Sequence, residues 1–180
     1  AKDVFLHIAG TYGDHATQNV EFGGPALADL SISARKTLAT MGAELSCEFA
    51  TFEPDAVLVD YLRACGKTGF ETVRPDADAN YLETRTIDLS LLEPLVALPD
   101  SVINNSSTIA KVAGTRIDQA FIGSCANGTF EDLRLAAQIL MGKNPIHGPG
   151  PERIMIFQNY ILFSSKTVYE NILFALDNSP

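Results

Sequence analysis

The chain has 180 residues, of which 46% are hydrophobic and 19% charged, so it has enough apolar surface to fold as one domain or two small lobes, and disorder is excluded. A formal net charge of −9, without a long Lys or Arg run, disfavours nucleic acid as a partner, because the overall field repels phosphate. Three cysteines without a CxxC pair argue against a disulfide framework and predict a reducing compartment, the cytoplasm.

The N-terminal residues 3–9 are rich in Val, Phe and Ile, which predicts a strand followed by a Gly-rich loop. No basic leader precedes them, and no apolar stretch approaches the ~18 residues that span a bilayer, which disfavours secretion and membrane insertion. Because the chain starts without Met inside a predicted strand, we expect it to be excised from a longer protein.

Helical and strand periodicities alternate along the rest of the chain. The predicted elements are a short helix over 26–30 opened by Pro25, a helix from about Ser33 to Leu45, a strand over 48–52, a helix from Pro54 to Gly66, a strand over 84–89, a strand over 119–122, a helix over 130–141, a strand over 153–157 and a helix through Val168, Ile172 and Leu176. This order predicts a layered α/β fold with mainly parallel strands, in which ligands gather at the carboxyl ends of the strands.

Two lobes are expected, residues 1–107 and 108–180, with residues 93–107 crossing between them. In the second lobe, Thr129 and Asp132 form a capping pair for the helix over 130–141. A buried stripe is expected on that helix, formed by Phe130, Leu133, Ala137 and Leu140.

Residues 123–128 (GSCANG) place a thiol on a tight turn between a predicted strand and a predicted helix. The positive end of the helix dipole favours the thiolate of Cys125, the form that binds metal or attacks electrophiles. The plain alternative is a small buried side chain, which is the commoner role of a lone cysteine. The same role is expected of Cys47 and Cys65, while Arg35 and Lys36 are expected to be a solvated pair.

Four segments of the chain resemble the large subunits of the aconitase family. They are residues 2–10 (KDVFLHIAG), residues 20–24 (VEFGG), residues 41–44 (MGAE) and residues 123–128, similar to the family's GSCTNG loop. Residues 53–55 (EPD) and 87–90 (IDLS) look closer to the isopropylmalate dehydratases of this family. The resemblance implies three-layer αβα lobes with mainly parallel sheets, as in the aconitase iron–sulfur domain.

The resemblance also implies site residues and partners. Cys125 matches a ligand of a 4Fe-4S cluster, Asn127 matches the loop Asn, and Glu44 matches a carboxylate that contacts the iron-bound water and the substrate hydroxyl. The implied reaction is dehydration and rehydration of a hydroxy di- or tricarboxylate, in leucine biosynthesis for an isopropylmalate dehydratase, by a large subunit paired with a small, swivelling-domain subunit. Without the resemblance, Glu44 is a surface charge at a helix end.

The sequence departs from the family pattern at Thr40, where an Asn is usual, at Ala126, where a Thr is usual, and in lacking the CxxC that supplies the other two cluster ligands. An iron–sulfur cluster needs several thiolates, so these 180 residues are expected to be inactive alone. Two alternatives stay open: an aconitase or homoaconitase paralogue, and a cluster-free binding or interaction module derived from this fold.

Overall fold

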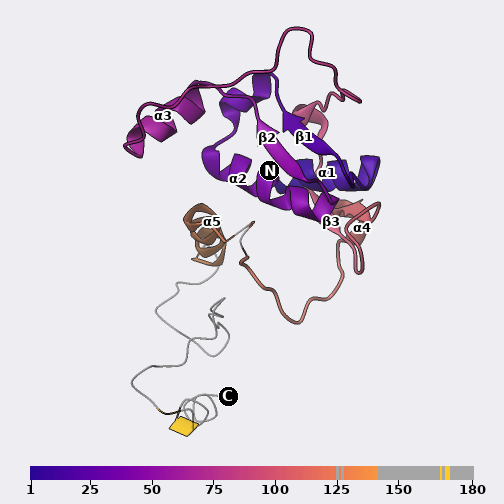
Figure 1. The fold of residues 1–180 in the computed structure, drawn as a ribbon. Coiled ribbons are helices and arrows are strands. Elements are labelled where there is room, and N and C mark those ends of the chain that lie inside the picture. Colours follow the sequence, from indigo (N-terminus) through magenta and orange to yellow (C-terminus); the bar gives the residue numbers. More distant parts are fainter. Residues whose placement is uncertain (125, 127, 142–166, 168, 171–180) are drawn as a thin grey trace. The chain divides into compact units, whose positions relative to one another are not determined.

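The computed structural model describes residues 1–124, 126, 128–141, 167, 169 and 170 (Figure 1). The chain divides into two compact units, residues 1–136 and 137–180. The helices and strands are α1 (Lys2–Tyr12), β1 (Asn19–Phe22), the 3-10 helix η1 (Pro25–Asp29), α2 (Ile32–Met41), η2 (Gly42–Leu45), β2 (Phe49–Phe52), α3 (Ala56–Ala64), η3 (Leu89–Leu91), β3 (Leu95–Ala97), β4 (Ser106–Thr108), α4 (Ile109–Val112) and α5 (Phe130–Met141). The predicted lobe boundary near residue 107 stays a prediction, and the elements predicted over 153–157 and around Ile172 lie outside the described residues.

The first element is a helix, so the strand predicted over residues 3–9 is wrong. Phe5, Ile8 and Ala9 are all buried, and their spacing of three and four residues places them on one face of a helix. A short run rich in aliphatic residues has no unique periodicity, and here packing against α2 and the strands β3 and β4 selects the helix.

Strands β1 and β2 form a parallel pair in which Asn19 lies opposite Phe49 and Phe22 opposite Phe52. They are joined through η1, α2 and η2, as a parallel pair requires, and α2 packs against β2. The packing is close at Gly42, because a Cβ there would lie 2.8 Å from the Cβ of Ala50. The predicted strand over 48–52 and the predicted helix beginning near Ser33 are confirmed.

Strands β3 and β4 form an antiparallel hairpin, with Leu95 opposite Thr108. This hairpin packs on α1, and the Asp3 carboxylate accepts a hydrogen bond from the Leu95 amide at 2.8 Å. Residues 93–107 therefore fold back on α1, and whether they also connect two lobes stays a prediction. With one parallel and one antiparallel pair among the described residues, the chain is a mixed α/β fold, and a three-layer arrangement stays a prediction.

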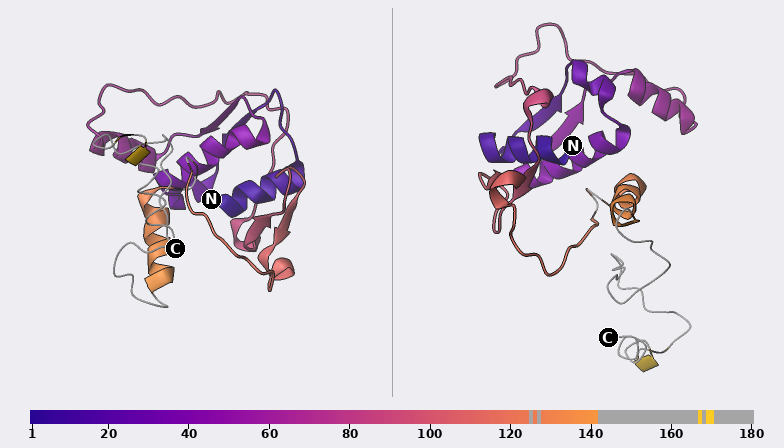
Figure 2. Two further views of the ribbon diagram at one scale, coloured as in Figure 1. Left: turned by 90° about the horizontal axis from the view of Figure 1, so that it is seen from below. Right: turned by 180° about the vertical axis from the view of Figure 1, so that it is seen from behind.

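Two further predicted strands, over 84–89 and 119–122, do not form. Residues 67–88 form a long loop, which can be traced in both views of Figure 2. At its end, the Asp88 carboxylate caps η3 by accepting a hydrogen bond from the Ser90 amide at 2.9 Å. Alternating side chains indicate a strand only if a partner strand is available for the ladder, and these segments have none among the described residues.

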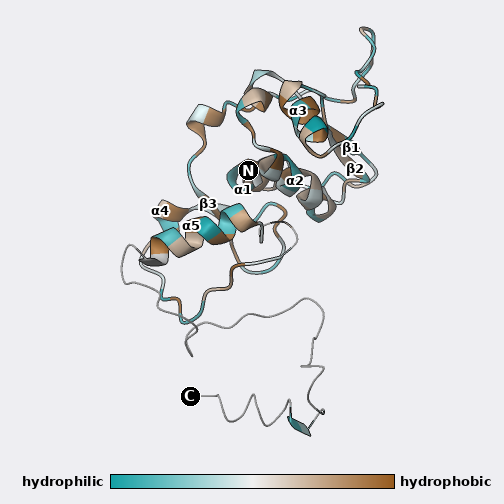
Figure 3. Cartoon of the chain, turned by 90° about the vertical axis from the view of Figure 1, so that its left-hand side faces the viewer, coloured by the Kyte–Doolittle hydropathy of each residue, from teal (hydrophilic) through white to brown (hydrophobic). Residues whose placement is uncertain are grey.

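Helix α5 has the predicted bounds, and its predicted cap is confirmed. The Asp132 carboxylate accepts from the Thr129 amide at 3.0 Å and from the Thr129 hydroxyl at 2.7 Å. The predicted buried stripe is wrong for Phe130 and Leu133, which are 84% and 48% exposed. Figure 3 shows polar and apolar residues alternating along the helices. Within the described part of the chain, none of the helices is long and apolar enough to cross a bilayer.

Candidate active site

Helix α2 carries the residues around which the candidate site is built. The Ser31 hydroxyl accepts from the Ala34 amide at 3.1 Å and caps its first turn. Arg35 in the next turn is 5% exposed, and its guanidinium donates to the Leu27 carbonyl at 2.6 Å and to both carboxylate oxygens of Asp55 at 2.7 Å. Arg35 is therefore a buried residue that links α2 to Leu27 and Asp55, and the prediction of a solvated residue there is wrong.

The carboxylate of Asp55 makes two kinds of contact. Besides pairing with Arg35, it accepts from the Leu58 amide at 3.0 Å and so caps α3. The hydrogen bond from the Arg35 side chain is the main reason that the pKa of Asp55 is lowered to about 2. Lys36 is exposed, and its ammonium donates to the Tyr61 hydroxyl of α3 at 2.9 Å. The start of α2 is thus fixed to η1 and to α3.

Glu44 lies in η2, at the end of the helical segment that α2 begins. Its neighbour Leu45 is 2% exposed and fixes the backbone in the core, while Glu44 is exposed. Ser46 then ends the segment in the left-handed region, with φ of 60°. Within the described part of the chain, no hydrogen bond or ion pair holds the Glu44 carboxylate, so the group is available to a ligand.

The GSCANG loop is described at residues 123, 124, 126 and 128, whereas Cys125 and Asn127 lie outside the described residues. Ala126 is 5% exposed and belongs to the core cluster of α1 and α2. Its carbonyl accepts a hydrogen bond of 2.7 Å from the buried hydroxyl of Thr37. A Cβ at Gly128 would lie 2.8 Å from the Ser124 carbonyl oxygen, so the turn requires glycine there.

The structure therefore brings the neighbour of Cys125 to the same helical segment that carries Glu44. Thr37 and Glu44 are seven residues apart, a separation of about 10 Å along a helix. Thr37 was not among the predicted site residues, although a signal was present: it is a hydroxyl residue directly before Leu38 in a predicted helix, and a buried hydroxyl needs a partner.

The cysteines of the chain do not by themselves fit a four-iron cluster. Cys47 packs against the core as predicted, and burial raises the pKa of its thiol. Cys65 is exposed, so its predicted core position is wrong. The described residues contain no group of three or more His, Cys, Asp or Glu side chains that could hold a metal. Of the three cysteines in the sequence, only Cys125 is predicted to be a cluster ligand, and a cluster needs several thiolates.

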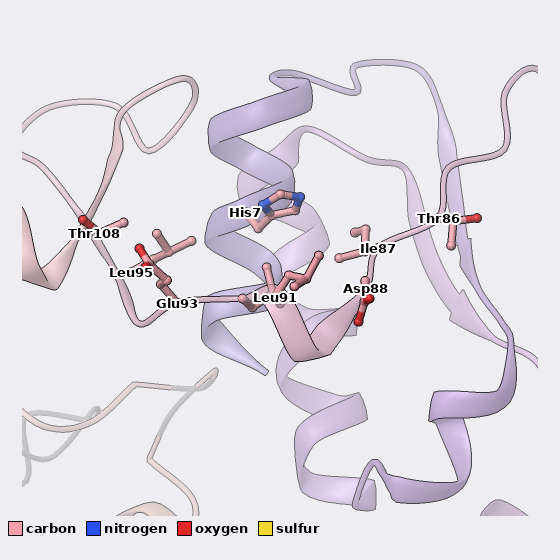
Figure 4. A pocket seen from close by; sticks show the side chains of 9 residues that line it. His7, Thr86, Ile87, Asp88, Leu91, Glu93, Leu95 and Thr108 are labelled. Atoms are coloured by element: carbon pink, nitrogen blue, oxygen red, sulfur yellow. The ribbon is translucent and has the colours of Figure 1, made fainter.

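A cavity of about 380 Å³ lies elsewhere in the first unit. Figure 4 shows His7 of α1 beside it, with Ile87 and Leu91 from the segment that leads to the hairpin. The Asp88 carboxylate at its rim is already bonded to Ser90. Glu44, the predicted site residue that the structure describes, does not line this cavity.

The profile of the aconitase family (aconitate hydratase) matches residues 1–109, which include Glu44. The chain belongs to the aconitase family. This confirms the resemblance predicted from the four segments.

Individual relatives of the chain are large subunits of enzymes in this family. The chain is 48% identical over 147 residues to the 3-isopropylmalate dehydratase large subunit of Mycolicibacterium smegmatis, covering 82% of this chain and 35% of that protein. It is 42% identical over 149 residues to a probable methanogen homoaconitase large subunit of Methanothermobacter thermautotrophicus, covering 82% and 34%. A 3-isopropylmalate dehydratase large subunit of Acetivibrio thermocellus is 40% identical over 144 residues, covering 79% and 34%.

The chain thus spans about a third of the length of the curated relatives that it matches. Because the matched stretch is about four-fifths of the 180 residues, it necessarily includes both Glu44 and the GSCANG loop. The similarity therefore extends beyond residue 109 to the segment in which Cys125 lies.

Proposed function

We propose that this chain is part of a hydro-lyase of the 3-isopropylmalate dehydratase type, which removes water from a hydroxy dicarboxylate and adds it back. The observation that carries the proposal is the 48% identity to a 3-isopropylmalate dehydratase large subunit over a stretch that includes Glu44 and the GSCANG loop. The contact between Thr37 and Ala126 supports it further, because it joins this loop to the helical segment that carries Glu44.

Glu44 is the proposed acid–base residue. Its exposed carboxylate can accept a hydrogen bond from the hydroxyl of a hydroxy acid, and it can hold the proton that the departing or attacking water exchanges. The neighbouring Leu45, which is 2% exposed, fixes the backbone from which this carboxylate extends.

Cys125 is proposed as one thiolate ligand of a 4Fe-4S cluster, and Asn127 as a residue that orders the loop. The remaining thiolates must come from outside these 180 residues. The relatives are named large subunits, which supports a separate small subunit as the partner that completes the site.

The test compares Glu44→Gln with a matched control, Glu48→Gln, in the complete protein with its partner subunit. Glu48 is an exposed glutamate four residues further on, so both variants lose one surface carboxylate. With 3-isopropylmalate as substrate, we expect Glu44→Gln to lower kcat by about 100-fold or more, the usual contribution of a general acid–base group. Glu48→Gln should stay within twofold of the wild type.

Equal activity of the two variants would remove Glu44 from the proposed mechanism. A homoaconitase is the second candidate, favoured by the 42% identity to a homoaconitase large subunit. Turnover of a homoaconitase substrate in place of 3-isopropylmalate by the same preparation would select it. If the complete protein turns over neither of these substrates nor an aconitase substrate, the cluster-free binding module is the remaining hypothesis.

A further inference from the structure

One buried hydrogen bond joins segments that lie 89 residues apart in the sequence. The Thr37 hydroxyl, on a residue 6% exposed in α2, donates to the Ala126 carbonyl at 2.7 Å. The methyl group of Ala126 is buried in the same core cluster as Leu38 and Met41. The loop is thus held on α2 by a polar contact and an apolar contact at the same residue.

This hydrogen bond has no ready substitute. Both partners are buried, so the Ala126 carbonyl would lose its partner without gaining water if the hydroxyl were removed, and such an unpaired group strongly disfavours the docked state. At its other end the loop is fixed separately, because the Thr129 hydroxyl and amide are bonded to Asp132 at the start of α5.

We propose that Thr37 is a positioning residue for the GSCANG loop: its hydroxyl fixes the backbone of Ala126 on α2. The bearing of Thr37 on catalysis rests on the function proposed above, whereas the docking of Ala126 does not. Thr37 acts through the loop and contacts no substrate.

The experiment follows the Ala126 methyl group by NMR in the 180-residue chain with ¹³C-labelled alanine methyls, assigned through an Ala126→Gly variant. In the wild type we expect a shifted resonance with contacts to the methyl groups of Leu38 and Met41. Thr37→Val, which keeps the shape of the side chain, should raise the undocked fraction of the loop about tenfold, the effect of leaving one buried acceptor unpaired.

Three further variants make the result specific. Thr37→Ser keeps the hydroxyl and should preserve the docked resonance, while Thr37→Ala should raise the undocked fraction at least as much as Thr37→Val. This pair differs by one hydroxyl, so it decides the question even if Thr37→Val does not fold. Thr51→Val is the control, because Thr51 is exposed in β2, and it should leave the resonance unchanged.

An Ala126 methyl at the random-coil position in the wild type, or the same resonance in Thr37→Ala and Thr37→Ser, would overturn the proposal. In the complete protein, Thr37→Ala should lower kcat with little change in KM, and Thr37→Ser should restore it. If the wild-type complete protein shows no hydro-lyase activity, the proposed function fails, and the methyl resonance still decides whether Thr37 holds the loop.

Discussion

The ion pair between Arg35 and Asp55 should stabilise the protein by a measurable amount. Arg35 is 5% exposed and Asp55 is 23% exposed, so removal of the carboxylate charge leaves a buried guanidinium without its counter-ion. Asp55→Asn is the informative change, because Asn is as good a helix cap as Asp and the hydrogen bond to the Leu58 amide can persist.

The magnitude follows from the pKa of Asp55, which is lowered from 3.8 to about 2, mainly by the hydrogen bond from Arg35. A shift of this size corresponds to about 2 kcal/mol of folding free energy. Asp55→Asn should therefore lower the free energy of unfolding at pH 7 by about 2 kcal/mol, and Asp55→Ala by about 1 kcal/mol more, because the cap is then lost as well.

The same pair predicts a pH dependence. Because the folded-state pKa of Asp55 lies below its unfolded value, the stabilisation is fully present above about pH 4 and is lost as the pH falls through about 2. The difference between wild type and Asp55→Asn should accordingly shrink over this window. Urea unfolding at pH 7 should show the midpoint of Asp55→Asn about 1 M lower.

A matched control is Asp60→Asn, since the pair of Asp60 with Arg63 is exposed on both sides. This variant should stay within about 0.5 kcal/mol of the wild type. Equal stability of Asp55→Asn and wild type at pH 7, or an undiminished difference near pH 2, would refute the reasoning.

Two further changes test the packing and the cap described above. Gly42→Val should lower the free energy of unfolding by about 1–3 kcal/mol, because its Cβ would lie 2.8 Å from that of Ala50; thermal unfolding measures this, and a variant as stable as the wild type would contradict the close contact of η2 with β2. Asp132→Ala should destabilise α5 by about 1 kcal/mol through loss of its bonds to Thr129. Faster amide exchange confined to α5 is the expected sign, and unchanged exchange would argue against the cap.

The family can be recognised from the sequence because the resemblance depends on short continuous motifs. Residues 41–44 and 123–128 each carry their pattern within a few residues, and the match to the aconitase family confirms the family assignment. The roles of Glu44, Cys125 and Asn127 stay predictions, since the exposure of Glu44 alone tests none of them.

Local signals also determined several elements. The cap formed by Thr129 and Asp132 depends on atoms three residues apart, and the helix after Pro54 begins with a cap and ends before a glycine, Gly66, with φ of 71°. Such interactions form within one turn of the chain, so the residues that make them are already neighbours in the sequence.

Only the tertiary structure decided the remaining features, because their partners are distant in the sequence. Residues 3–9 form a helix since α2 and the β3–β4 hairpin bury one face of it. The carboxylate that neutralises Arg35 lies 20 residues away, and the carbonyl that Thr37 bonds lies 89 residues away. A periodicity reports which side of a segment is apolar, whereas the identity of the group that meets a buried donor is set by packing.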